Sequence, residues 1–236
     1  MPLYKEQGIV LRTMRLGEAD RIVTVLTQGT GKIRAVAKGI RKTRSKFGAR
    51  LDPFTHVDLL LYKGRELDIV TQAEIITSFR ELRADYNRFT AGEMILEAAD
   101  RVIEDREPNT RMFMLLLTSL RRLIDPTSDA GAVADSFLLR MTSLAGFRPA
   151  LNACAECGRT EVERFSIQQG GMVCDEHRVG GTIRVSEGTV PYLTALLDGE
   201  PDLADGGARA EGSNLVRAYL EYHLNRPLRA WAYVPR

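Results

Sequence analysis

Residues 8–38 read GIVLRTMRLGEADRIVTVLTQGTGKIRAVAK, so that short apolar runs alternate with polar and glycine-containing breaks. Runs rich in Val, Ile, Leu and Thr are typical of β-strands, and the breaks between them are typical of turns. Two more runs of this kind follow, HVDLLLY at 56–62 and LDIVTQAEIIT at 67–77. Five short strands predict a small closed barrel of the OB type, because closure removes the exposed edges that a lone sheet would leave.

After residue 78 the spacing of apolar residues becomes helical. Thr90 followed by Glu93 has the capping-box pattern of a helix start. Further helical patterns cover 110–125, 129–146, the region near 190–198, and 212–225, with a polar loop that we expect to be mobile at 198–212. The predicted fold class is α+β. An N-terminal five-stranded OB-type β-barrel at 1–78 precedes an α-helical domain at 79–236.

Four residues of the helical domain have the spacing of a metal site. Cys154 and Cys157 form one pair with a two-residue spacer, Cys174 and His177 form another, and sixteen residues separate the pairs. This separation is within the range of zinc ribbons, with His in place of the last Cys. Four protein ligands leave no open position for water, so we predict one structural Zn²⁺ in a zinc-ribbon-like insert at about 151–182. The alternative is a redox CxxC pair beside an unrelated Cys and His.

A run of cations starts on the third predicted strand and continues into the loop that follows it. Alternation along KIRAVAK puts Ile33, Ala35 and Ala37 on one face and cations on the other. No carboxylate interrupts the run, which predicts a stripe that follows the phosphates of a nucleic acid. Phe47 lies inside the stripe and could stack on a base or pack; the alternative for the whole run is a solvated loop that aids solubility. The candidate DNA-binding residues are Lys32, Arg34, Lys38, Arg41, Lys42, Arg44, Lys46 and Arg50.

The distribution of charge supports a polyanionic partner. Residues 1–50 carry twelve Lys or Arg and three Asp or Glu, whereas the remaining residues carry twenty-one and twenty-eight, and the chain as a whole has a net charge of +2. One basic end on an acidic body is expected when a polyanion docks at one place. We expect no membrane partner and a cytoplasmic, nucleoid-associated protein, because there is no long apolar run and no signal peptide. Three cysteines, an odd number, argue for reduced thiols or metal rather than disulfides.

Signatures of catalysis are missing from the sequence. Neither a P-loop, a dinucleotide-binding G-x-G-x-x-G nor a nucleophile elbow occurs. His56 and His223 have no nucleophile near them in sequence, and we interpret both as packing or surface residues. The sequence therefore predicts a protein that is not an enzyme and has no small-molecule substrate.

Three segments resemble the bacterial RecO family of recombination mediators: 8–42, which starts with GIVLRTMRL, FLLRMTSLAGFRPALNACAECG at 137–158, and YLEYHLNRPLRA at 219–230. The resemblance covers almost the whole chain. It implies a DNA repair and homologous recombination mediator that binds single- and double-stranded DNA and anneals complementary strands. It also implies that the mediator works with RecR to help load RecA onto DNA coated by single-strand-binding protein (SSB), without hydrolysing ATP.

The resemblance further implies partner surfaces that the residues alone do not locate. RecR is a direct partner, RecA an indirect one, and the acidic C-terminal tail of SSB would occupy an apolar groove of the helical domain. Arg121 and Arg122 could form a cationic rim beside MFMLLL at 112–117, although such a stripe can also be core. An RNA-binding or transcription-associated OB/zinc protein is the alternative function, and an unrecognised hydrolase is a third.

Overall fold

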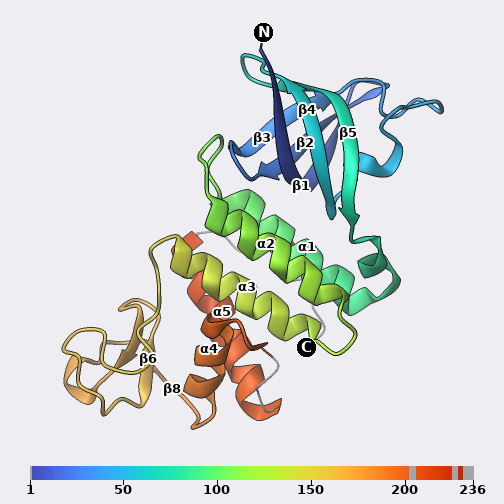
Figure 1. Cartoon of the computed structure of the whole chain (residues 1–236). Helices are drawn as coiled ribbons and strands as arrows, with labels where there is room; N and C mark the ends of the chain where they lie inside the picture. The colour runs from blue at the N-terminus through green and yellow to red at the C-terminus, as the bar shows by residue number, and fades with distance from the viewer. Residues whose placement is uncertain (1, 202–205, 225–227, 231–236) are drawn as a thin grey trace. The chain divides into compact units, whose positions relative to one another are not determined.

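The computed structural model of the chain describes residues 2–201, 206–224 and 228–230 (Figure 1). The chain divides between Asp125 and Pro126 into two compact units. We call the N-terminal one the barrel unit and the C-terminal one the helical unit. Among the described residues, none of the helices has the length and apolar character needed to cross a bilayer.

The barrel unit starts with five strands that close into a barrel in the order β1-β2-β3-β5-β4. β3 and β5 run parallel, whereas the other neighbouring strands are antiparallel. The closed barrel is the one that the spacing of apolar runs predicted. Its strands are β1 (Leu3–Leu16), β2 (Asp20–Thr27), β3 (Gly31–Ala37), β4 (Thr55–Tyr62) and β5 (Asp68–Ser78).

Alternate residues of the strands fill the barrel interior, and β2 is buried on both of its faces. Val23 and Val25 belong to the interior cluster, while Ile22 and Leu26, at the alternate positions, are also buried. Helices α1 (Tyr86–Val102) and α2 (Thr110–Ile124) pack against the neighbouring strand β1. Part of the outer barrel wall is therefore covered by protein and cannot contact a ligand. Two short 3₁₀ turns complete the unit, η1 (Gly48–Leu51) and η2 (Arg80–Ala84).

Helix α1 begins earlier than its sequence pattern predicted. The Asp85 side chain accepts a hydrogen bond from the Arg88 backbone N–H at 2.9 Å and caps the helix. Thr90 lies one turn inside, where its hydroxyl donates to the Tyr86 carbonyl at 2.8 Å. The prediction of Thr90 as the N-cap is wrong, because Asp is an equally good cap and already stands at the start of the first turn.

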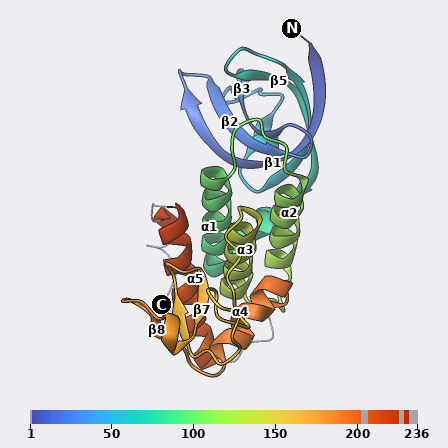
Figure 2. The same cartoon turned by 90° about the vertical axis from the view of Figure 1, so that its left-hand side faces the viewer.

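The described part of the helical unit contains three helices and a small sheet with strand order β7-β6-β8. Figure 2 shows the helices together with β7 and β8 of this sheet. The helix at 129–146 is confirmed: the side chain of Asp129 caps it, and Gly146 adopts a left-handed backbone (φ 98°) just after its end. The elements are α3 (Ala130–Leu144), β6 (Arg164–Ser166), β7 (Gly171–Val173), η3 (Asp175–His177), β8 (Ile183–Arg184), α4 (Thr189–Asp198) and α5 (Gly206–Leu224).

The polar segment predicted as a loop at 198–212 is helical in its second half, where α5 begins at Gly206. Residues 202–205 of that segment lie outside the described residues. Glu211 on α5 accepts hydrogen bonds from the Ser186 backbone N–H, at 2.9 Å, and from the Thr189 hydroxyl at the start of α4. This contact joins positions too distant in sequence for a local polarity pattern to reveal it. The α+β fold class, with a five-stranded barrel followed by helices and an inserted Cys/His element, is confirmed.

Candidate nucleic-acid interface and metal centre

Strand β3 supplies the first part of the candidate interface, and its side chains alternate as predicted. Ile33, Ala35 and Ala37 are buried in the barrel, whereas Arg34 is exposed on the outer face. A strand presents alternate residues to opposite faces, so the apolar half of β3 closes the core and the polar half forms barrel wall. Arg34 is therefore accessible to an anionic ligand.

The loop after β3, residues 38–50, which we call the basic loop, is held against the barrel by apolar side chains. Ile40, Phe47 and the following Leu51 belong to the same buried cluster as the barrel interior. Phe47 is only 1% exposed, so the hypothesis that it stacks on a base is wrong and the packing alternative is correct. Because these residues anchor the backbone of the basic loop in the core, the cations between them are held close to the barrel surface.

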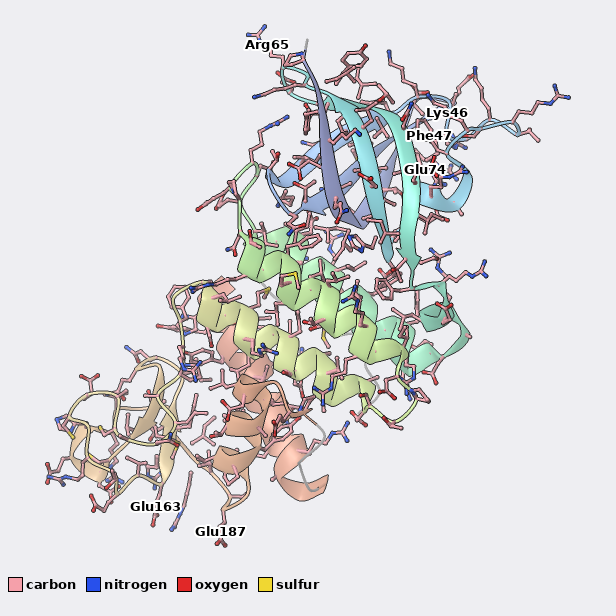
Figure 3. All side chains as sticks on the ribbon, in the orientation of Figure 1. Lys46, Phe47, Arg65, Glu74, Glu163 and Glu187 are labelled. Carbon is pink, nitrogen blue, oxygen red and sulfur yellow. The ribbon has the colours of Figure 1, made fainter. Side chains whose placement is uncertain are left out.

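The cations of the basic loop are oriented by backbone oxygens. Lys46 donates to the Thr71 carbonyl on β5 at 2.7 Å, and Figure 3 shows Lys46 and Phe47 beside this strand. Arg41 donates to the Glu18 carbonyl in the β1–β2 turn, also at 2.7 Å. A carbonyl orients a cation without cancelling its charge, so the loop keeps its positive surface. The other cations of the loop are partly or fully exposed: Lys38, Lys42, Arg44 and Arg50.

Lys32 does not join this surface, contrary to its predicted role. Its ammonium group donates to the Asp100 carbonyl at 2.5 Å and lies 3.3 Å from the carboxylate of Asp105. Arg12 on β1 also pairs with the Asp100 carboxylate, at 2.5 Å. The Lys32 side chain is 12% exposed because the acidic end of α1 covers the barrel wall at this point. Lys32 therefore joins the barrel to α1 and is not available to phosphate.

Two arginines that the sequence analysis left out extend the positive surface. Arg15 and Arg21 stand directly opposite each other in the β1–β2 hairpin. Like charges at such positions repel, and a bound anion would relieve the repulsion. Arg21 lies 3.5 Å from the Asp52 carboxylate, whereas no carboxylate among the described residues pairs with Arg15. The signal was the turn in RLGEADR at 15–21, which places residues before and after it side by side.

We call the combined set the cationic surface. Its residues come from the β1–β2 hairpin, the outer face of β3 and the basic loop, all within the barrel unit. Its members are Arg15, Arg21, Arg34, Lys38, Arg41, Lys42, Arg44, Lys46 and Arg50.

The four predicted metal ligands converge in the helical unit. The potential ligand atoms of Cys154, Cys157, Cys174 and His177 all lie within 4.8 Å of one another. The two sulfurs of Cys157 and Cys174 are 3.8 Å apart, and the Cys174 sulfur is 3.2 Å from His177 Nδ1. Zinc–sulfur bonds of about 2.3 Å give a tetrahedron whose sulfur–sulfur edges are about 3.8 Å. The donor set and its spacing therefore suit one zinc ion in a closed, structural site.

Backbone hydrogen bonds hold these ligands in two tight turns. The Gly158 N–H donates to the Cys154 carbonyl at 2.9 Å, and the His177 N–H donates to the Cys174 carbonyl at 3.1 Å. The backbone N–H of Cys174 lowers the pKa of the Cys154 thiol to about 6. A lowered pKa favours the thiolate form, which is the form that binds a metal.

The two other histidines pack against aromatic rings. His56 is buried with neither ring nitrogen hydrogen-bonded, its ring centroid lies 5.8 Å from that of Phe113, and burial lowers its pKa. His223 packs between Phe147 and Tyr219, with both ring centroids at 4.4 Å. The sequence indicated that both histidines are packing or surface residues, and the structure shows that both pack.

The apolar stripe of α2 is mostly core. Met112, Phe113 and Leu115 to Leu117 are buried, and Met114 is the exposed member of the stripe. Arg121 lies exposed near the end of the helix. The stripe beside Arg121 and Arg122 is therefore not an open groove, and the placement of a peptide site there loses its apolar component.

The fold and the two sites together define a class of OB-barrel proteins that combine a cationic barrel surface with an appended Cys₃His metal element. Comparison with known families narrows this class. Residues 1–79 match the family described as "Recombination protein O N terminal", and residues 83–232 match "Recombination protein O C terminal". The chain belongs to the RecO family.

Curated relatives are similar to the chain over its whole length. A protein of Nocardioides sp. named "DNA repair protein RecO" is 49% identical over 243 residues, which cover 99% of this chain and 100% of the relative. Proteins of the same name from Thermobifida fusca and Frankia casuarinae are each 47% identical over 242 residues, covering 100% of both chains.

Proposed function

We propose that this chain is a DNA-binding recombination mediator that needs no catalytic chemistry of its own. Membership of the RecO family supports a role in DNA repair and recombination. The observation that carries the proposal for this chain is the basic loop, whose cations surround an apolar anchor in the barrel core. Cations held close to a closed scaffold bind a polyanion with less loss of side-chain and loop entropy than cations on a free segment.

Phosphate binding determines which nucleic acids the cationic surface accepts. Lys and Arg side chains on a barrel wall reach the sugar-phosphate backbone and do not read base edges, so binding is largely independent of sequence. We propose that both single- and double-stranded DNA bind. Bringing two complementary strands together places two polyanions side by side, and the cationic surface lowers their repulsion during annealing.

The remaining parts of the proposal rest on the family. A RecO-type mediator works in the cytoplasm with RecR and with the SSB tail, and helps RecA to replace SSB on single-stranded DNA without hydrolysing ATP. The apolar stripe beside Arg121 in α2 is mostly core, so we propose no surface there for the SSB tail. RecR and the SSB tail are partners to be tested by direct binding with the purified proteins.

We propose that zinc, held by Cys154, Cys157, Cys174 and His177, braces the helical unit. Zinc bound by four protein ligands supplies folding energy and no reactive water. Between the two ligand pairs lie strands β6 and β7, of three residues each, and β8, which follows His177 and completes the sheet, has two. A metal crosslink stabilises so small a sheet, because its own apolar core is minimal.

Charge reversal of the basic loop tests the central proposal. The variant Arg41→Glu/Lys42→Glu/Arg44→Glu is expected to lose annealing of complementary strands at moderate salt. The matched control Arg111→Glu/Arg148→Glu/Arg178→Glu has the same change of net charge at exposed positions outside the cationic surface. Fluorescence anisotropy over a salt series measures binding, with a slope of roughly −0.7 per phosphate for single strands. Equal affinity of both variants for DNA would remove the basic loop from the mechanism.

The same experiment separates the RNA-binding alternative. Cationic contacts to the backbone are compatible with either nucleic acid, so structured RNA and single-stranded DNA are titrated as competitors. Preference for structured RNA, together with absent annealing, would favour the alternative function over the mediator.

A further inference from the structure

The turn between β4 and β5, residues 63–67, carries an exposed aromatic and cationic surface separate from the basic loop. Tyr62 and Leu3 stand opposite each other in neighbouring strands, and they are 39% and 50% exposed. Lys63 and Arg65 are exposed beside them, and Figure 3 shows Arg65 extending from the barrel. No carboxylate in the described part of the chain pairs with either cation. An exposed aromatic ring flanked by unpaired cations is a combination that binds single-stranded nucleic acid.

The turn is held in one conformation by a buried carboxylate. Asp68 is fully buried and accepts hydrogen bonds from the Gly64 backbone N–H at 2.8 Å, from Arg106 at 2.9 Å and from the Tyr4 hydroxyl. A Cβ at Gly64 would lie 1.8 Å from the Leu67 carbonyl oxygen, so the turn closes as tightly as a glycine allows. Because the turn is fixed at both ends, its exposed side chains start from defined positions.

The basic loop approaches this turn across β5. Lys46 is anchored on the Thr71 carbonyl, and Tyr62 pairs with Ile69, two residues before Thr71. At about 3.3 Å per residue along a strand and about 4.8 Å between strands, the backbone of Tyr62 lies about 8 Å from that anchor. One short segment of single-stranded DNA can therefore contact Lys46 and Tyr62 together.

Charges on the outer face of β4 and β5 give this path a direction. Asp58 and Glu74 are exposed and stand opposite each other, four residues before Tyr62 along β4. Their carboxylates repel phosphates, whereas Lys63 and Arg65 at the other end, which outnumber the exposed Glu66 of the same turn, attract them. Single-stranded DNA bound at Lys46 is therefore expected to continue toward the β4–β5 turn and not toward the middle of the β4–β5 face.

We propose that single-stranded DNA bound by the basic loop continues over β5 onto the β4–β5 turn, where Tyr62 stacks on a base and Lys63 and Arg65 contact phosphates. This inference rests on the proposed DNA-binding function and extends its binding site. The turn then adds to the affinity for single strands, whose unpaired bases can stack, and adds less for a duplex, whose bases are already stacked.

Aromatic substitutions on the full chain test the stacking contact. Stacking on one base contributes a 5- to 150-fold effect on affinity, from about 1–3 kcal/mol per base. Tyr62→Ala is expected to weaken binding of single-stranded DNA by that factor. The oligonucleotide used has about 16 nucleotides, the upper end of the site size of one OB barrel. Tyr62→Phe keeps the ring and is expected to bind as the parent chain does. Tyr86→Ala removes an exposed tyrosine elsewhere in the barrel unit and is the matched control.

Charge variants provide the second arm. Lys63→Glu/Arg65→Glu is expected to make the salt slope for single strands less steep by about 1.4, or two phosphates at roughly 0.7 each. The extended path would be overturned if Tyr62→Ala and this double variant both bind DNA as the parent chain does while the basic-loop variant binds more weakly. That result would leave the proposed DNA-binding function standing. Equal losses in Tyr62→Phe and Tyr62→Ala would overturn the stacking contact. Parent-like binding by the basic-loop variant as well would instead contradict the DNA-binding function itself.

Discussion

Phe47 provides a direct test of the idea that the basic loop is anchored and not free. Its side chain is 1% exposed and packs with Ile40 and Leu51 in the barrel core, while charged residues flank it. Phe47→Ala removes a fully buried ring, and such changes cost about 3–5 kcal/mol of stability. Phe47→Leu keeps an apolar anchor of smaller size, and we expect a cost of about 1–2 kcal/mol. Neither substitution changes a charge.

The consequence for DNA binding follows from the loss of the anchor. A free basic loop must be ordered by DNA itself, at about 1–2 kcal/mol for each residue that is fixed. Even two such residues imply an affinity that is about 30- to 1,000-fold lower for Phe47→Ala, whereas Phe47→Leu is expected to stay within a few fold of the parent chain. Phe79→Ala removes another fully buried phenylalanine of the barrel unit outside the loop, and serves as the control for general destabilisation.

The assay combines urea denaturation, anisotropy with a labelled single strand, and hydrogen exchange over residues 38–50. All variants are compared at a temperature at which each remains folded. Faster exchange of the basic loop and weaker DNA binding in Phe47→Ala, but not in Phe79→Ala, support the anchor. If Phe47→Leu loses as much affinity as Phe47→Ala while its stability is near that of the parent, the ring contacts DNA and the reasoning from burial is refuted.

Three further predictions follow from buried or paired groups. Burial raises the pKa of Asp135, in the core of the helical unit, to about 6. The folded state is therefore stabilised by protonation of Asp135; this stabilisation is complete below about pH 4 and is lost as the pH rises through 6. Asp135→Asn is expected to remove this pH dependence of unfolding and to be more stable by up to about 3 kcal/mol at pH 7, measured by urea denaturation between pH 4 and 8. Lys32→Met is expected to lower the free energy of unfolding by about 1–3 kcal/mol, because the contacts with Asp100 and Asp105 are lost. It should leave the dependence of DNA affinity on salt concentration unchanged. Arg34→Gln should instead make that salt slope less steep by about 0.7 and leave the stability unchanged. Removal of zinc with a chelator is expected to lower the melting temperature. Metal analysis should find one zinc per chain in the parent and in His177→Cys, which keeps four ligands, and none in His177→Ala.

The barrel and the metal ligands could be predicted because their signals are local. Strand alternation and turn residues repeat over a few positions, and the two Cys/His pairs each need only a two-residue spacer. The end of α3 was equally local, since Gly146 supplies the left-handed backbone that follows it. Each of these features is specified by residues that are neighbours in the chain.

The errors concern contacts between residues that are distant in the chain. Lys32 and Arg34 have the same charge and lie on the same face of β3, yet only Lys32 meets Asp100, 68 residues later. Phe47 lies within a run of cations, and nothing in that run shows that the barrel has space for its ring. Glu211, in the first turns of α5, contacts Ser186 and Thr189 at the start of α4. Local pattern does not contain such pairings, because they are decided by how distant elements pack together in the folded chain.

Under the proposed function the chain must release DNA as well as bind it, and its distribution of charge bears on both. Residues after 50 carry seven more acidic than basic side chains, so we expect most of the chain to repel DNA and binding to be confined to the barrel unit. Within that unit, the pairing of Lys32 with Asp100 and Asp105 removes one cation from the surface, while carbonyl contacts leave Arg41 and Lys46 charged. Contacts to phosphate exchange readily with salt and with competing strands. For the proposed annealing activity, we therefore expect a limited number of oriented cations to give binding firm enough to align two strands and weak enough to let the annealed duplex leave.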